Sequence, residues 1–274
     1  MTSLRPRILA HGILLCIGTT ALTASAQAQQ RGLKLPKADA PVVSQSVVDP
    51  TSVDALKRMS AFLSGLKTAE IVSESSLDVV TEEGQRVQLD GITGYKIRKP
   101  GFVITYVSDL KTRSFFYDGK NFTVYAPIMG FYATVPAPPT NREVLDTLYD
   151  KFGIALPLED LFRWNEAGFA RAEKLKSGYK LGTATIAGVK TDHYVFREDE
   201  VDWEIWMQQG DQPLPRKVVI VDRTDPARPT FTARLTWNVN PPLNDADFTF
   251  APNTTDKPVE LAVYEEVDVV ETGD

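Results

Sequence analysis

The chain has 274 residues, of which 43% are hydrophobic and 24% are charged, and its formal net charge is −6. This acidic balance argues against binding to a phosphate backbone, so no nucleic-acid partner is expected. Beyond the N-terminal region, no apolar stretch is long enough to cross a bilayer.

Residues 1–28 have the pattern of a secretory signal peptide. Two arginines precede an apolar stretch, which is followed by small-x-small cleavage sites after Ala26 and Ala28. The only cysteine, Cys16, lies inside this segment and follows a large residue, so we expect no lipid on it. We therefore predict a periplasmic protein that is not an integral membrane protein after cleavage. Its mature chain contains no thiol, which excludes disulfides, thiolate metal sites and cysteine catalysis.

The rest of the chain divides into three predicted parts. Residues 29–48 have neither a helical nor an alternating period and are predicted to form a flexible leader. Residues 49–252 provide roughly 200 positions, enough for one domain with a substantial core. Residues 253–274 form an acidic tail, in which a last strand near residues 259–263 remains an alternative.

The domain is predicted to begin with an amphipathic helix. Asp49 and Pro50 are helix start signals. Apolar side chains then recur at spacings of three and four residues, at Val53, Leu56, Met59, Leu63 and Leu66.

A long series of alternating segments follows, separated by turn sequences rich in Gly, Pro, Asp and Asn. The pattern predicts a large antiparallel sheet in sequential order. The predicted strands are residues 71–80, 86–97, 102–109, 113–118, 121–126, 131–136, 183–188, 191–198, 201–209, 216–223 and 230–239.

A second helix is predicted between the two halves of this sheet, over residues 140–153. Thr140 and Glu143 form a capping box, and Val144, Leu145, Leu148 and Phe152 share one face. Residues 156–164 are a shorter candidate. We expect Leu145 and Leu148 to cover the sheet and to gate entry to any space beneath them.

The stretch "FFYDGKNFTVYAP", residues 115–127, places five aromatic rings around one turn. Hairpin parity puts Phe115, Tyr117, Phe122 and Val124 on one face, and Phe131 joins them if it lies opposite Ala126. The other face is a mixture of tyrosine and threonine that tolerates water.

We predict a mainly β (α+β) fold, a large curled antiparallel sheet that forms a half-open barrel with helices on its concave face. Twist makes a sheet of about ten strands curl. Whether the concave face is filled by side chains or holds an empty cavity stays open. The cavity candidates are Phe115, Tyr117, Phe122, Val124, Phe131, Leu145, Leu148, Trp203, Ile205 and Trp237.

Catalytic patterns are weak. His193 is the only histidine that remains after removal of the predicted signal peptide, and no nucleophile motif accompanies it. Asp202 and Glu204 share a strand face and could act as paired carboxylates, although a solvated face is the simpler interpretation. Trp203 and Trp206 point to opposite faces, which argues against one stacking platform. No phosphate loop or dinucleotide motif is present, so we expect no cofactor and no metal.

Three stretches closely resemble a bacterial family of predicted periplasmic proteins, the domain of unknown function 2092, and the match runs from about Asp49 to Pro252. They are "FFYDGKNFTVYAPIMGFYATVPAPPT", "DKFGIALPLEDLFRW" and the pair "VDWEIWMQQGDQPLPRKVVI" with "DPARPTFTARLTWN". That family implies no activity and no catalytic residue.

The order of an early helix, a sequential sheet, a helical plug and "W-x-I-W … PLPRK" is also similar to lipoprotein carriers and receptors of the Lol type. This resemblance implies a half-barrel whose helical lid covers an apolar cavity for acyl chains. The chain differs from those receptors because it lacks a lipid-modified cysteine.

The sequence thus favours a non-enzymatic periplasmic binding protein that holds an apolar ligand, such as an acyl chain, a lipid or a lipidated partner. An envelope sensor or scaffold that binds a protein partner is the alternative. A hydrolase that uses Asp202 and Glu204, or His193, is a third hypothesis.

Overall fold

The computed structural model describes residues 47–154, 156, 158–162, 164 and 171–262. The predicted signal peptide, most of the predicted leader and the end of the acidic tail lie outside the described residues. None of the helices in the described ranges is long and apolar enough to span a membrane.

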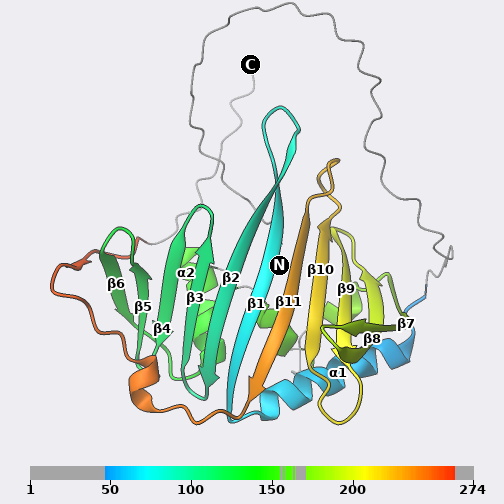
Figure 1. The fold of residues 1–274 in the computed structure, drawn as a ribbon, viewed down its shortest axis with the longest axis horizontal. Helices are drawn as coiled ribbons and strands as arrows, with labels where there is room; N and C mark the ends of the chain where they lie inside the picture. The colour runs from blue at the N-terminus through cyan, green and yellow to red at the C-terminus, as the bar shows by residue number, and fades with distance from the viewer. Residues whose placement is uncertain (1–46, 155, 157, 163, 165–170, 263–274) are drawn as a thin grey trace, which may run out of the picture. The chain divides into compact units, whose positions relative to one another are not determined.

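Twelve strands form one sheet (Figure 1). They are β1 (Thr68–Val80), β2 (Arg86–Arg98), β3 (Phe102–Ser108), β4 (Thr112–Tyr117), β5 (Asn121–Ala126), β6 (Phe131–Pro136), β7 (Ser177–Ile186), β8 (Val189–Arg197), β9 (Val201–Gln208), β10 (Pro215–Asp222), β11 (Thr230–Val239) and β12 (Lys257–Pro258).

The strand order is β12-β6-β5-β4-β3-β2-β1-β11-β10-β9-β8-β7. Strands β1 to β6 and strands β7 to β11 each form a meander of sequential antiparallel neighbours. The two meanders join where β1 pairs with β11, from Ala69 opposite Val239 to Leu77 opposite Phe231. The centre of the sheet is therefore made from the two ends of the domain.

The predicted mainly β fold with a large, mostly antiparallel sheet is confirmed. The predicted sequential order is wrong for the sheet as a whole, because β1 pairs with β11 and β6 and β7 lie at opposite ends. The half-open barrel is also wrong, because the sheet is neither closed nor strongly curled. Its outer strands, β12 and β7, do not pair with each other. The short β12 lies parallel to β6, and Val48 forms a bridge with Gly178 on β7. Two helices cover one face, so that face is buried without strong curling.

Helix α1 (Pro50–Gly65) begins as predicted. The Asp49 carboxylate accepts a hydrogen bond from the Thr51 backbone N–H at 2.9 Å, and proline occupies the first helical position. The buried side of the helix contains Leu56, Met59 and Leu63. This apolar stripe packs on the strands of the main core.

Helix α2 (Asn141–Phe152) also confirms its predicted start. Thr140 Oγ1 accepts a hydrogen bond from the Glu143 N–H at 3.2 Å, and Gly153 ends the helix in the left-handed conformation. In Figure 1 this helix lies behind β3 and β4. Three short helical turns complete the fold: η1 (Glu159–Phe162), α3 (Arg171–Lys174) and η2 (Asp245–Phe248).

The main core lies between these helices and one face of the sheet. Helical residues Leu56, Met59 and Leu148 belong to the same buried cluster as strand residues Ile71 and Ile205. Burial of this apolar surface, at roughly 25 cal/mol per Å², is the main stabilising term of the domain.

The chain after β11 crosses the opposite face of the sheet. Phe248 is buried beneath the Arg98 guanidinium, whose carbon lies 4.2 Å from the ring centroid. Phe250 then packs on Phe116, Tyr125 and Tyr132, with ring centroids 5.2, 5.0 and 5.1 Å away. The tyrosine face of the aromatic hairpin, which we expected to face water, is thus partly covered by the chain itself.

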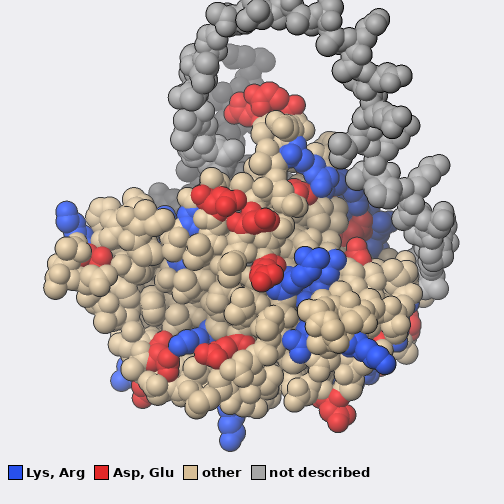
Figure 2. Space-filling model, in the orientation of Figure 1, with Lys and Arg blue, Asp and Glu red and all other residues tan. Residues whose placement is uncertain are grey.

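Figure 2 shows the molecule from the same side as Figure 1. Acidic and basic groups are scattered among wide uncharged areas, and neither sign dominates this view. Such a surface has no extended field of one sign that would steer a polyanion to it.

A candidate ligand-binding cavity

A cavity of about 620 Å³ lies between the helices and the centre of the sheet. Its apolar lining comes from α1, from the central strands, from α2 and from the segment after α2. These residues are Leu63, Leu66, Ala69, Ile71, Tyr95, Ile97, Phe102, Ile104, Leu145, Leu156, Leu158, Leu161, Leu235 and Trp237. Pockets for small ligands are typically about 300–1,000 Å³, so the cavity can accept one such molecule.

The floor of the cavity is the junction of the two meanders. Ile71 on β1 lies opposite Tyr95 on β2 and opposite Trp237 on β11. Trp237 Nε1 donates a hydrogen bond to the Pro215 carbonyl at 2.8 Å, so its polar atom has a partner. Burial raises the pKa of Tyr95, which keeps its phenol neutral. The floor is therefore uncharged.

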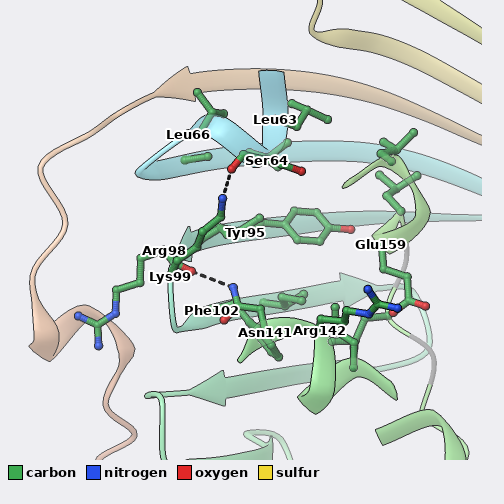
Figure 3. A pocket seen from close by; sticks show the side chains of 18 of the residues that line it. Leu63, Ser64, Leu66, Tyr95, Arg98, Lys99, Phe102, Asn141, Arg142 and Glu159 are labelled. Carbon is green, nitrogen blue, oxygen red and sulfur yellow. Dashed lines mark hydrogen bonds between the residues drawn. The ribbon is translucent and has the colours of Figure 1, made fainter. Parts of the chain in front are cut away.

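The turn between β2 and β3 forms one edge of the opening (Figure 3). Asn141, the first residue of α2, donates to the Arg98 carbonyl at 2.8 Å and accepts from the Gly101 N–H at 2.7 Å. Gly101 has a φ of 136°, which a residue with a side chain rarely adopts. These bonds fix the start of α2 beside the opening.

Charged groups border the same opening. Lys67, Lys99 and Arg142 carry positive charge there, and Asp146 and Glu159 carry negative charge; Arg98 also borders the opening, but its guanidinium contacts Asp245 and Phe248. Arg142 forms an ion pair with Asp146 along α2, with 3.7 Å between Nε and Oδ2. Lys99 Nζ donates a hydrogen bond to the Ser64 carbonyl near the end of α1. The site thus combines apolar walls with a charged rim.

The pattern of a family described as "Predicted periplasmic protein (DUF2092)" matches residues 52–262. The chain belongs to this family. The match confirms the resemblance seen in the sequence, and the description of the family confirms the predicted periplasmic localisation. No curated protein matches the chain.

Several solved structures are distantly similar. Lipoprotein LppX of Mycobacterium tuberculosis has 13% identity and a TM-score of 0.42, over 72% of this chain and 98% of the other. An uncharacterized conserved protein from Thermus thermophilus has 11% identity and a TM-score of 0.45, over 77% and 99%. A LolA superfamily protein from Nitrosomonas europaea has 9% identity and a TM-score of 0.36, over 73% and 97%.

Two of the ten residues that the sequence suggested as cavity candidates line the cavity of this family member, Leu145 and Trp237. Leu148, on the buried side of α2, belongs to the main core. The other seven lie on strands away from the cavity. Tyr117, Phe122, Trp203 and Ile205 are buried, whereas Phe115, Val124 and Phe131 are half-buried.

The aromatic hairpin has the predicted parity. Phe115 lies opposite Val124, and Phe131 lies opposite Ala126. The rings pack on one another, with 6.2 Å between the centroids of Phe115 and Phe122. The hairpin borders the cavity region through β3, where the Phe102 ring centroid lies 6.3 Å from that of Phe122 and where Ile104, another lining residue, lies opposite Phe115.

Sequence reasoning missed most of the cavity wall. On β2, Tyr95 and Ile97 alternate with Lys96 and Arg98, and that alternation was the available signal; on β1 the signal is weaker, because Ile71 is followed by Val72. Alternation assigns these side chains to one face, but it does not show where that face remains unfilled.

The suggested catalytic groups are engaged in other contacts. Asp202 accepts hydrogen bonds from Arg197 at 2.6 Å and from Arg228 at 2.7 Å. Partial burial opposes ionisation of Asp202, but these bonds hold its pKa below the usual value. Glu204 lies 2.7 Å from His193 Nε2. An ionised, arginine-bound Asp202 lacks the raised pKa that a general acid of a glycosidase needs.

Replacing Asp202 with asparagine is expected to lower the free energy of unfolding by about 1–2 kcal/mol at neutral pH, because the arginines lose their shared carboxylate. The folded protein holds the pKa of Asp202 below its usual value, so the ion-pair contribution is complete above about pH 4 and is lost as the pH falls through the folded pKa. Urea unfolding at several pH values should therefore show the two proteins converging in acid. The control is Asp109→Asn in an exposed turn; a pH-independent difference for Asp202→Asn would contradict this assignment.

Proposed function

We propose that this protein is a non-enzymatic periplasmic binding protein that holds an apolar ligand, an acyl chain of a lipid or of a lipidated partner, in the cavity between α1, α2 and the central strands. The observation that supports this most strongly is the chemistry of the walls. The floor and roof consist of Leu, Ile and aromatic side chains, and charge is confined to the rim.

The energetics of such binding require no catalytic group. Each methylene moved from water into an apolar site contributes about 0.8 kcal/mol, so ten buried methylenes contribute about 8 kcal/mol before the costs of ordering the ligand. The cavity volume of about 620 Å³ is large enough for a chain of that length.

The roof of the cavity is formed by α2 and the residues after it, and it is anchored beside the opening. Leu145 on α2 lines the cavity, and the first residue of α2 is fixed to the β2–β3 turn by Asn141. Leu156, Leu158 and Leu161 complete the roof with apolar side chains. In this proposal, a ligand enters beside the β2–β3 turn and its chain extends toward Trp237.

Native mass spectrometry of the protein isolated from the periplasm tests this function. We expect a bound lipid that organic extraction removes, because the apolar walls are more stable when covered than when exposed to water. Extracted protein should then bind a fluorescent long-chain fatty acid. The absence of both endogenous lipid and probe binding would contradict the proposal.

A second candidate function rests on apolar side chains at two turns. Leu110 in the β3–β4 turn is 75% exposed, and Ile128 and Met129 in the β5–β6 turn are 77% and 59% exposed. Both turns lie at the same end of the sheet, because β4 and β5 are antiparallel neighbours. This favours docking to an envelope partner, and protein that contains no extractable lipid would support this candidate over the first.

A further inference from the structure

The charged residues at the rim of the cavity bear on the polar end of the ligand. Among the cations that border the opening, the Arg98 guanidinium is directed away from it (Figure 3). That group contacts Asp245 and the ring of Phe248 on the other face of the sheet. Arg142 is paired with Asp146. These contacts leave Lys67 and Lys99, and of the two it is Lys99 whose ammonium group is held at the opening by a hydrogen bond.

Lys99 reaches across the opening. Its backbone lies in the β2–β3 turn, and its ammonium group donates to the Ser64 carbonyl in the last turn of α1 (Figure 3). The end of a helix carries partial negative charge, which favours a cation there. The ammonium group has three N–H donors, and the Ser64 carbonyl takes one of them.

No carboxylate among the described residues forms an ion pair with Lys99. Burial lowers the pKa of this lysine, although the residue remains exposed at the opening, where no described carboxylate supplies a balancing negative charge. An anion bound at this position would supply the negative charge and accept hydrogen bonds from the remaining N–H donors.

We propose that the cavity takes a single-chain amphiphile with an anionic head group, a carboxylate or a phosphate monoester, whose head is bound by Lys99 at the opening while its chain lies against Ile71 and Trp237. This inference rests on the proposed function and names the class of ligand for the same site. Arg142 lies on the same rim and adds positive charge beside the head group.

The volume of the cavity supports one chain rather than two. A methylene group occupies about as much space as a water molecule in the liquid, roughly 30 Å³. The cavity of about 620 Å³ therefore holds about twenty such groups when it is full. One chain of sixteen to eighteen carbons fits within this space, whereas a lipid with two such chains does not.

The test compares three ligands that share a hexadecyl-length chain: palmitate, hexadecyl phosphate and the neutral 1-hexadecanol. Each is titrated against delipidated full-length mature protein, and affinity is measured by displacement of an uncharged fluorescent apolar probe. We expect at least one of the anions to bind about tenfold or more tighter than the alcohol, because the ammonium group of Lys99 can form a charge-assisted hydrogen bond with an anionic head group but not with a neutral one. The tighter anion identifies the source, a free fatty acid or a phosphate-headed lipid.

Lys99→Met keeps the length of the side chain and removes its charge. We expect this variant to lose about tenfold in affinity for the preferred anion and to bind hexadecanol within about twofold of the unmodified protein. Lys99→Arg should retain the preference for the anion. Lys111→Met, at the opposite end of β3, is the matched control and should change none of the affinities.

The outcomes separate the two levels of the proposal. Equal affinity for all three ligands, or an equal loss of affinity for all three in Lys99→Met, would show that Lys99 does not recognise the head group. The cavity would then still bind the apolar chain, and the proposed function would stand. Failure of every ligand and of the fluorescent probe would overturn the proposed function itself. Thermal unfolding of Lys99→Met verifies that the variant is folded when it is titrated.

Discussion

Replacing Ala69 with phenylalanine is expected to lower the affinity for a fluorescent long-chain fatty acid by more than about tenfold, which corresponds to about 1.4 kcal/mol. Ala69 is buried on β1 and lines the cavity, so the added ring occupies the volume that the ligand needs. Because the ring enters open space, the free energy of unfolding should change by less than about 1 kcal/mol. Probe titration and urea unfolding on the same sample measure both quantities.

Ala133→Phe is the matched control for this substitution. Ala133 is also buried on the sheet, but it does not line the cavity. Here the same added ring has no room, and overpacking should reduce the free energy of unfolding by about 1–3 kcal/mol while the folded protein keeps its affinity for the probe. If Ala69→Phe destabilises the protein as much as Ala133→Phe and leaves binding intact, the cavity is not the ligand site.

Replacing Phe122 with alanine is expected to reduce the free energy of unfolding by about 3–5 kcal/mol, the typical cost of removing a packed phenylalanine. The side chain of Phe122 is 1% exposed and its ring packs against Phe102 and Phe115. The loss leaves an empty volume that these neighbours fill only in part. Chemical denaturation measures the change, with the slope of the transition as a test of two-state behaviour.

Phe122→Leu serves as the conservative control and should cost less than about 1.5 kcal/mol, since most of the volume remains. The two variants also distinguish a packed core from a ligand site. A small stability loss in Phe122→Ala, together with a large loss of probe affinity, would mean that the aromatic hairpin binds the ligand directly.

Local sequence patterns predicted the elements of this domain well. The first helix begins at Asp49 and the second at Thr140, because each side chain caps the backbone N–H groups that follow it. The parity of the hairpin was also predictable. Two short turns leave little freedom of register, so Phe115 and Phe131 had to share a face with Phe122.

The partners of distant strands were not predictable in the same way. Alternation tells which face of β1 is apolar, but it does not show that Ile71 lies beside Trp237 from the other end of the domain. The cavity forms at this junction. The sequence therefore identified Trp237 as a cavity residue but not its neighbours on β1 and β2. The preference for an anionic ligand that we infer rests on the position of Lys99 at the opening. A hydrogen bond to the carbonyl of Ser64, which is distant in sequence, holds Lys99 there.

The position of Phe250 was missed for a related reason. A single ring in an irregular segment has no periodicity, and the sequence offers no local signal for its contacts with Tyr125 and Tyr132. The tyrosines were assigned to a wetted face because the segment that covers them lies more than a hundred residues further along the chain.

The pairing of β1 with β11 also bears on how the protein avoids association with copies of itself. Until residues 230–239 join the sheet, β1 and β10 each present an unpaired edge with free N–H and C=O groups. Contacts between such distant segments form late, because the chain entropy of closing a long loop opposes them. A chain shortened before Thr230 would keep both edges exposed and would be prone to pair with other chains, so the last long strand protects the protein from aggregation as well as completing its cavity.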